Sequence, residues 1–146
     1  MTDMLPRVKL CYAKAGSLVG LPYVFSGGHN SLWLPSLSFA QGIGTKGAGV
    51  DCSSGVSIVL RAGGMCWNPR PPFPLSTGNL MEWGEEGLGL YMSVYVRNDA
   101  VEEHTGLWFN PRFFEHEWWQ APHTGADVGW MTLDTTGMIV RHWPNS

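Results

Sequence analysis

Charged residues are scarce in this chain of 146 residues. Lysine, arginine, aspartate and glutamate together make up 14% of it, and the formal net charge is −3. The lysines and arginines are scattered along the sequence without forming a basic run. A nucleic-acid-binding surface needs clustered cationic side chains, because neutralised phosphates supply most of the affinity. The sequence therefore predicts that nucleic acid is not a partner.

Long apolar runs are also missing. No stretch approaches the roughly 18 consecutive apolar residues of a membrane-spanning helix, so we expect no membrane insertion. The first residues, MTDMLPRVKL, lack the apolar centre of a secretion signal. These absences predict a protein that is made in the cytoplasm without a signal peptide.

Cysteine is sparse and its spacing is uninformative for metal binding. Cys11, Cys52 and Cys66 are an odd number of cysteines and include no C-x-x-C pair, which argues against a zinc ribbon or a disulfide framework. A Cys11–Cys66 bridge is allowed by count, but synthesis in the cytoplasm favours thiols. We interpret Cys11 and Cys66 as structural residues and expect neither a metal nor a cofactor.

The sequence is rich in apolar residues, glycine and tryptophan. It is 44% hydrophobic and contains 19 glycines, 10 prolines and 8 tryptophans. The length predicts a single domain over residues 1–146, and the composition favours a loop-rich α+β fold over a helical bundle. The tryptophans are expected to fill the core, although the same side chains would suit a groove that grips glycan or peptide.

Local patterns predict helices packed on a small antiparallel sheet. Apolar spacing indicates a helix over 5–19 and another from Cys52 to the Gly63-Gly64 pair. Ser76 or Thr77 is expected to cap a short helix that ends near Trp83. Residues 29–50 are expected to form a long loop, with His29 as a solvated loop residue. The runs that are typical of strands are 90–97, 104–109, 113–118, 129–133 and 137–142.

A cysteine lies at the start of the second predicted helix, within the stretch Gly49-Val50-Asp51-Cys52-Ser53-Ser54-Gly55-Val56. Asp51 is the expected N-cap of that helix. A thiol in the first turn feels the positive end of the helix dipole, which lowers the thiol pKa and raises the reactive thiolate fraction. Cys52 is therefore a candidate nucleophile. The alternative is a small buried hydrophobe at a helix start.

Two other stretches complete an ordered pattern with this cysteine. Residues 20–28 read GLPYVFSGG, and residues 104–109 read HTGLWF, a strand that opens with a histidine. In this order, over about Ala13 to Arg141, the motifs resemble those of the NlpC/P60 papain-like cysteine peptidases, which cleave peptide stems of bacterial cell walls. The sequence departs from the family pattern at Ser54, where glycine is common, and in a long insertion between Gly28 and Asp51.

The resemblance implies a fold, a reaction and a setting. The fold would be papain-like, with N-terminal helices and the nucleophile helix packed on a small antiparallel sheet. The enzyme would be a monomeric peptidoglycan endopeptidase with Cys52 as nucleophile and His104 as base, cleaving the γ-D-glutamyl to diamino acid bond of the stem peptide. It would be of the phage type, an endolysin or a virion-associated hydrolase that acts on the cell wall. The residues expected to line the substrate cleft are Tyr23, Asp51, Ser53 and Ser54.

A third polar residue should orient the catalytic histidine. A hairpin turn centred on Asn110-Pro111 would place residue 116 or 117 across from His104, and the spacing usual in the family also falls on His116. We therefore predict His116, with Gln120 and Glu115 as alternatives. Gln120 precedes APHTG, which is similar to the H-A-P-H-T-G stretch of the family, and Glu115 would suit relatives with an acidic third residue.

Other functions are compatible with the same residues. An amidase or a transacylase could use the same Cys-His pair, since related folds host several reactions. A catalytically silent wall-binding or phage tail module would retain the binding groove and contact the cell wall through its tryptophans. In a purely structural domain, Cys52 would be buried and His104 satisfied within the core.

Overall fold

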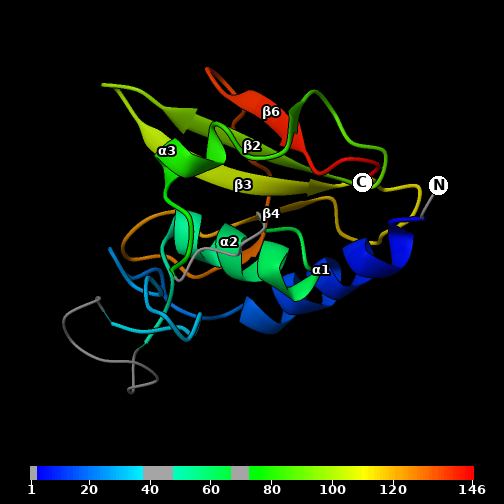
Figure 1. Ribbon diagram of the computed structural model, residues 1–146. Helices are drawn as coiled ribbons and strands as arrows, with labels where there is room; N and C mark the ends of the chain where they lie inside the picture. The colour runs from blue at the N-terminus through cyan, green and yellow to red at the C-terminus, as the bar shows by residue number, and fades with distance from the viewer. Residues whose placement is uncertain (1–2, 38–47, 67–72) are drawn as a thin grey trace.

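The computed structural model describes residues 3–37, 48–66 and 73–146, and Figure 1 shows how they are layered. Helices α1 (Leu5–Leu18) and α2 (Cys52–Ala62) pack against each other and lie along one face of an antiparallel sheet. The one-turn helix α3 (Thr77–Leu80) packs against the centre of the sheet, capped by Ser76. This arrangement confirms the predicted α+β class.

The sheet of the described residues has six strands in the order β1-β6-β2-β3-β4-β5, and every neighbouring pair is antiparallel. Its centre is the β2–β3 hairpin, in which Met92 pairs with Phe109 and Asn98 with Glu103. The strands are β1 (Glu85–Glu86), β2 (Met92–Asn98), β3 (Glu103–Phe109), β4 (Trp118–Gln120), β5 (Gly129–Trp130) and β6 (Ile139–His142).

Helix α1 forms where the sequence analysis expects it. Its buried residues, Val8, Cys11, Ala15 and Leu18, recur every three or four positions and so form one apolar stripe. The Asp3 carboxylate accepts a hydrogen bond from the Leu5 backbone N–H at 3.0 Å. No helix within the described ranges combines the length and the hydropathy that a bilayer crossing requires.

The core lies between the helices and the inner face of the sheet. Alternate residues of β2, namely Met92, Val94 and Val96, have no exposed area, because successive strand side chains point to opposite faces. Leu107 and Phe109 continue this face on β3. Opposite them the buried side of α2 contributes Val56, Val59 and Leu60.

Cys11 and Cys66 both belong to this core, as predicted for structural cysteines. Cys11 is a free thiol whose sulfur lies 3.9 Å from the sulfur of Met65. Burial raises the pKa of the Cys11 thiol to about 12, so the side chain behaves as a small neutral hydrophobe.

The strand expected over 113–118 is wrong. The backbone N–H groups of Phe113 and Phe114 both donate to the carbonyl of Asn110, which forms a compact turn, and pairing with β3 begins at Trp118. Strand β1 is absent from the predicted strands, because its two glutamates show no apolar alternation.

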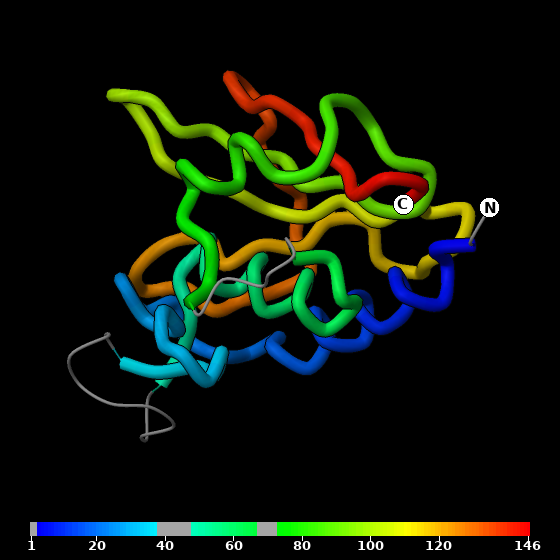
Figure 2. The backbone as a smooth tube through the Cα atoms, viewed as in Figure 1, coloured from blue at the N-terminus to red at the C-terminus, as the bar shows by residue number. Residues whose placement is uncertain are grey.

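The predicted loop over 29–50 is bridged within itself and, near its end, to residue 23. Ser36 pairs with Gly49, and Tyr23 pairs with Val50, through isolated bridges. Residues 20–23 also run beside 126–128, where backbone hydrogen bonds join them (Figure 2). Residues 38–47 of this loop, and 67–72 of the proline-rich stretch after α2, lie outside the described residues.

Gly55 allows α2 to approach β4 closely. A Cβ at Gly55 would lie 2.9 Å from the Cη2 atom of Trp119 and 3.2 Å from a methyl carbon of Val50. The Trp119 ring is completely buried and its Nε1–H donates to the carbonyl of Ala15 at 2.9 Å, so the ring has no room to withdraw. This contact sets the distance between the start of α2 and the β3–β4 edge of the sheet.

We expect Gly55→Ala to destabilise the protein even though alanine is the better helix former. The helix propensity gain is about 1 kcal/mol, whereas overpacking of a rigid core costs about 1–3 kcal/mol. Chemical denaturation should therefore show a lower free energy of unfolding. The matched control is Gly78→Ala in α3, where the nearest atom, Nδ2 of Asn98, is at an ordinary 3.5 Å. Equal stability changes for the two variants would contradict the close-approach argument.

Candidate active site at the start of helix α2

Asp51 is the N-cap of α2, as predicted. Its Oδ1 atom accepts the Ser54 backbone N–H at 2.8 Å, and the Ser54 hydroxyl oxygen accepts the Asp51 backbone N–H at 3.1 Å. This reciprocal pair is a capping box, which satisfies backbone donors at the helix start. Cys52 is therefore the first residue of the helix, in the first turn where the helix dipole is positive.

Ser54 has a structural role that the sequence analysis misses. Its hydroxyl also donates to the carbonyl of Gly27 at 2.7 Å, which holds the Gly27-Gly28 turn against α2. The Ser54 side chain is completely buried. A side chain without exposed area cannot line a cleft, so the prediction that Ser54 contacts substrate is wrong.

The Cys52 thiol is a free thiol in a dry environment, with a residue exposure of 6%. Burial, and after it repulsion from the nearby Asp51 carboxylate, raise the pKa of Cys52 to about 12. Backbone hydrogen bonds from Thr105 and Ser53 act in the opposite direction. The expected lowering of the pKa by the helix dipole is therefore wrong, because desolvation of the thiolate outweighs the dipole. The resting side chain is a protonated thiol at neutral pH.

Tyr23 lies beside this thiol. It forms a bridge with Val50, one residue before the N-cap of α2. The phenol is half-buried, and burial raises the pKa of Tyr23, with the charges of Cys52 and Asp51 adding to the shift. The structure thus brings Tyr23, Asp51 and Cys52 together, and their role in lining a substrate cleft stays a prediction.

His29 is the residue at this site that sequence reasoning missed. Its Nε2 atom lies 2.8 Å from both carboxylate oxygens of Asp51 and 3.2 Å from the Ser53 hydroxyl. The side chains of His29 and Asp51 are only 23% and 13% exposed. The expectation of a solvated loop histidine is therefore wrong. A separation of 22 positions across a long loop carries no periodic signal that could reveal the pair.

His104 is held by Gln120 on the outer face of the sheet. The His104 Nε2 atom lies 2.8 Å from Oε1 of Gln120, while Nε2 of Gln120 donates to the carbonyl of Thr132 at 2.9 Å. Because the amide nitrogen is used by Thr132, the amide oxygen must accept from His104, so the histidine carries its proton on Nε2. In the neutral ring this leaves Nδ1 as the proton acceptor.

The backbone of β3 connects the histidine to the thiol. Thr105 follows His104 in β3, and the Thr105 backbone forms the hydrogen bond that lowers the pKa of Cys52. The start of β3 therefore lies against the start of α2. The backbone next to His104 is thus in contact with the Cys52 thiol.

His116 and Glu115 are not the partners of His104, which corrects the prediction of His116. The His116 ring stacks on Trp130 with ring centroids 4.9 Å apart, and its side chain is exposed. The predicted tight turn would have brought residue 116 opposite His104. The actual connection from Asn110 to Glu117 is longer, so β4 pairs Trp118 with Trp108 and the register carries Gln120 to the histidine.

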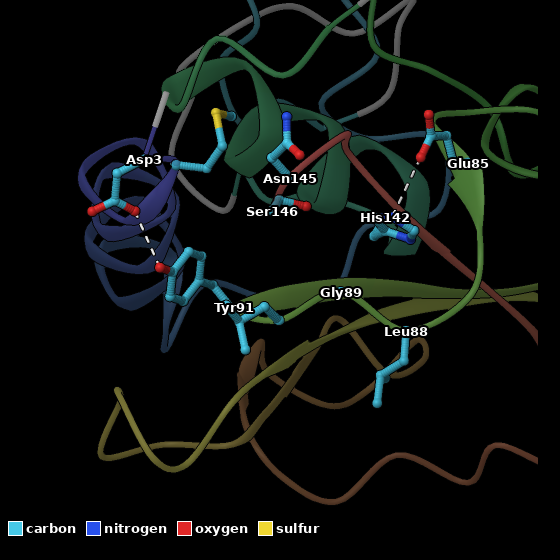
Figure 3. Close-up of a pocket in the computed structure, with 10 residues that line it drawn as sticks. Asp3, Glu85, Leu88, Gly89, Tyr91, His142, Asn145 and Ser146 are labelled. Carbon is cyan, nitrogen blue, oxygen red and sulfur yellow. Dashed lines mark hydrogen bonds and ion pairs between the residues drawn. The ribbon is translucent and has the colours of Figure 1, made fainter. Parts of the chain in front are cut away.

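A cavity of about 480 Å³ opens beside the His104–Gln120 pair. Its lining also includes Arg97, Met131 and Thr132. A separate cavity of about 520 Å³ lies near both ends of the chain, where Tyr91 donates to Asp3 and His142 faces Glu85 (Figure 3). That second cavity contains none of the candidate site residues.

Among the described residues, no group of three or more histidine, cysteine, aspartate or glutamate side chains is arranged to hold a metal ion. The candidate site offers a thiol, an imidazole, an amide and hydroxyl groups.

Comparisons with known proteins identify the fold. No protein-family model matches the sequence, and no curated protein matches it. Among solved structures, a hypothetical invasion protein of Mycobacterium tuberculosis superposes with a TM-score of 0.73 at 21% identity over 98% of this chain. The peptidoglycan hydrolase RipB of M. tuberculosis gives 0.69 at 20% identity over 96%. A P60 domain from an antigen of M. avium paratuberculosis gives 0.69 at 17% identity over 95%.

The chain has the NlpC/P60 fold. It spans 65% of the invasion protein, 66% of RipB and 94% of the separate P60 domain. At these levels of identity the similarity establishes the NlpC/P60 fold alone. An activity has to be inferred from the residues described above.

The charge of Asp51 can be separated from its capping role. Asp51→Asn keeps a side-chain oxygen for the Ser54 N–H and removes the negative charge beside the thiol. We expect the pKa of Cys52 to fall below about 12 because repulsion of the thiolate is lost. At any pH below the pKa the thiolate fraction rises, so alkylation by iodoacetamide should accelerate. The pH dependence of Cys52 alkylation, followed by mass spectrometry, measures this.

The control for that experiment is Glu86→Gln, which removes an exposed charge from β1 at the other edge of the sheet. It should leave the alkylation of Cys52 unchanged. An identical pH profile for Asp51→Asn and the unmodified protein would show that the Asp51 charge does not act on the thiol.

Proposed function

We propose that this protein is a cysteine peptidase that hydrolyses the stem peptide of bacterial peptidoglycan. The observations that support the proposal are a thiol at a helix start in contact with the Thr105 backbone, and the neighbouring His104, whose tautomer is set by Gln120. The NlpC/P60 fold, shared with a protein named as a peptidoglycan hydrolase, supports the same substrate class. The bond we propose is that between γ-D-glutamate and the diamino acid.

In this mechanism the sulfur of Cys52 attacks the scissile carbonyl carbon while its proton passes to Nδ1 of His104. Because burial keeps the thiol protonated at neutral pH, the proton transfer accompanies the attack and no stable thiolate precedes it. Collapse of the tetrahedral intermediate expels the amine, which takes the proton from His104. Water then hydrolyses the thioester with His104 as base, which restores the thiol.

The start of α2 would stabilise the oxyanion of the intermediate. Backbone N–H groups in the first helical turn lack partners within the helix, and the positive end of the helix dipole favours negative charge there. The N–H groups proposed for this role belong to Cys52 and Ser53. Tyr23 and Asp51, which lie beside the thiol, are the proposed walls of the substrate cleft.

The burial of Cys52 favours one alternative, a catalytically silent wall-binding module on the same fold. The two functions differ in whether the thiol turns over a substrate. An amidase or a transacylase would use the same pair of residues but leave different products, which mass spectrometry of the new termini distinguishes. The phage origin remains a prediction from the sequence.

Cys52→Ala should abolish the release of peptides from purified peptidoglycan, because no other group can form the thioester. His104→Ala should lower the rate by at least about 100-fold, the lower range for a positioned acid–base group. Release is measured by mass spectrometry of the soluble fragments, after circular dichroism confirms that each variant is folded. The control is Cys11→Ala, which removes a core thiol outside the site. Undiminished hydrolysis by Cys52→Ala would exclude the proposed mechanism.

Gln120 is the proposed orienting residue for His104. Gln120→Ala should lower kcat on a soluble stem peptide by about 100-fold with little change in KM, because the imidazole loses its fixed tautomer and ring plane. Gln120→Glu should restore most of the rate, since a carboxylate also accepts the Nε2 proton. His116→Ala and Glu115→Ala serve as matched controls and should behave as the unmodified enzyme. A large loss of kcat in His116→Ala alone would instead assign the orienting role to His116.

A further inference from the structure

The His29–Asp51 pair lies one residue before the candidate nucleophile. The Nε2 atom of His29 is 2.8 Å from both carboxylate oxygens of Asp51. An ionised carboxylate can only accept hydrogen bonds, so the proton of this contact belongs to the imidazole, on Nε2. Nδ1 of His29 has no hydrogen-bond partner among the described residues, and the side chain is 23% exposed. This nitrogen can therefore take up a second proton from solvent.

The turn before His29 holds the imidazole in this place. The Ser54 hydroxyl donates to the carbonyl of Gly27 at 2.7 Å, and the Gly28 backbone N–H donates to the Ser36 hydroxyl at 2.8 Å. Gly28 has a φ of +79°, and a Cβ there would lie 2.5 Å from the Ser54 hydroxyl oxygen, so the position requires glycine. The backbone thus places His29 against the start of α2, which distinguishes it from a flexible surface histidine.

The Asp51 carboxylate acts on the neighbouring thiol. After burial, its negative charge is the largest contribution to the raised pKa of Cys52. The carboxylate is also fixed in position, because it caps α2 by accepting the Ser54 backbone N–H at 2.8 Å. A group that offsets this charge and leaves the cap intact would therefore make Cys52 easier to ionise.

The imidazole of His29 is suited to that task. A protonated imidazole in contact with a carboxylate offsets its charge, whereas a neutral imidazole does not. Imidazole changes charge between about pH 5 and 8, a range in which Cys52 remains a thiol. By linkage, a proton on His29 favours the loss of the proton from Cys52. As pH rises and His29 becomes neutral, the repulsion from Asp51 returns in full.

Two other titratable groups lie near the thiol. Burial raises the pKa of Tyr23, so this phenol stays neutral throughout that pH range. His104 precedes Thr105, whose backbone contacts the thiol, and its imidazole can also change charge in this range. An effect of His29 is therefore separated from one of His104 by comparing proteins in which His104 is unchanged.

We propose that His29 is a positioning residue for the nucleophile, which acts through Asp51 and determines how strongly that carboxylate repels the thiolate of Cys52. Protonated His29 forms an ion pair with Asp51 and makes the thiol more reactive, and neutral His29 leaves the repulsion in place. His29 takes no part in making or breaking bonds to substrate. The consequence for hydrolysis rests on the proposed function, whereas the effect on thiol ionisation does not.

The ionisation of Cys52 is measured through its rate of reaction with dithiodipyridine, followed by mass spectrometry of the peptide that contains Cys52. Far below the pKa of a thiol, this rate rises about tenfold per pH unit when no other group is linked. The rate of the parent should rise less steeply between about pH 5 and 8, because His29 loses its proton there.

His29→Gln keeps an N–H donor for Asp51 but cannot gain a positive charge. This variant should react about three- to tenfold more slowly than the parent at about pH 5.5 and at the same rate at about pH 8.5. Identical profiles of the parent and His29→Gln would overturn the proposal. His29 would then serve only to tie its turn to α2.

The matched control is His142→Gln in β6. His142 is also a partly buried histidine beside a carboxylate, with its Nε2 atom 3.6 Å from Glu85, and it is 19% exposed. It belongs to the opposite side of the sheet from β3 and β4. Its reaction rates should equal those of the parent at every pH. The same slowing in His142→Gln as in His29→Gln would contradict a local effect at the thiol and overturn the proposal.

The link through Asp51 is tested in a second background. In Asp51→Asn protein, the further change His29→Gln should alter the rate at about pH 5.5 by less than about twofold, because the charge that His29 offsets is gone. A full effect of His29→Gln in that background would overturn the role of Asp51. Proton–nitrogen correlation spectra give a separate readout, since neutral His29 should carry its proton on Nε2. A proton on Nδ1 would equally contradict the proposal.

Hydrolysis of a soluble stem peptide tests the consequence for turnover. We expect kcat/KM of His29→Gln to be about threefold below that of the parent at about pH 5.5 and equal to it at about pH 8.5, because a thiol that ionises more readily also gives its proton to His104 more readily. An equal loss at both pH values would contradict a role that depends on the charge of His29. If the parent hydrolyses no stem peptide, the proposed function fails, while the reaction with dithiodipyridine still decides the role of His29.

Discussion

The close contact between Gly55 and Trp119 is the constraint on which the candidate site depends. Cys52 and His104 come from different layers of the fold, and their separation is set by how nearly α2 approaches the edge of the sheet. The Trp119 ring fills the space that a side chain at position 55 would need, and its hydrogen bond to Ala15 also ties α1 to the same point. If α2 lay further from β4, the Cys52 thiol would lose its contact with the Thr105 backbone.

The electrostatics of the thiol follow from that packing. The first turn of a helix favours a thiolate, but close packing excludes water, and the neighbouring Asp51 carboxylate adds repulsion. Asp51 is nevertheless needed to cap α2, and it is partly engaged by His29. The nucleophile is therefore a neutral thiol, which makes proton transfer to His104 part of the chemical step in the proposed mechanism.

Strand β4 contacts both the nucleophile helix and the candidate catalytic histidine. Strand β4 is only three residues long, yet Trp119 points inward to α2 while Trp118 and Gln120 point outward. Trp119 thus positions the nucleophile helix, and Gln120 holds the histidine. The length of the connection from Asn110 to Glu117 determines which residues take these places.

The sequence by itself determined the local features: the helix start at Cys52 with its Asp51 cap, the stripe of α1, and the alternation that makes β2 and β3. These are set by neighbours within a few positions, where spacing and hydrogen-bonding chemistry act directly. Only the tertiary structure decided that Gln120 and not His116 meets His104, that His29 pairs with Asp51, and that burial outweighs the dipole at the thiol. Each of these depends on contacts between segments far apart in the chain, on the path of an irregular turn, or on the exclusion of water. None of these leaves a periodic pattern in the sequence.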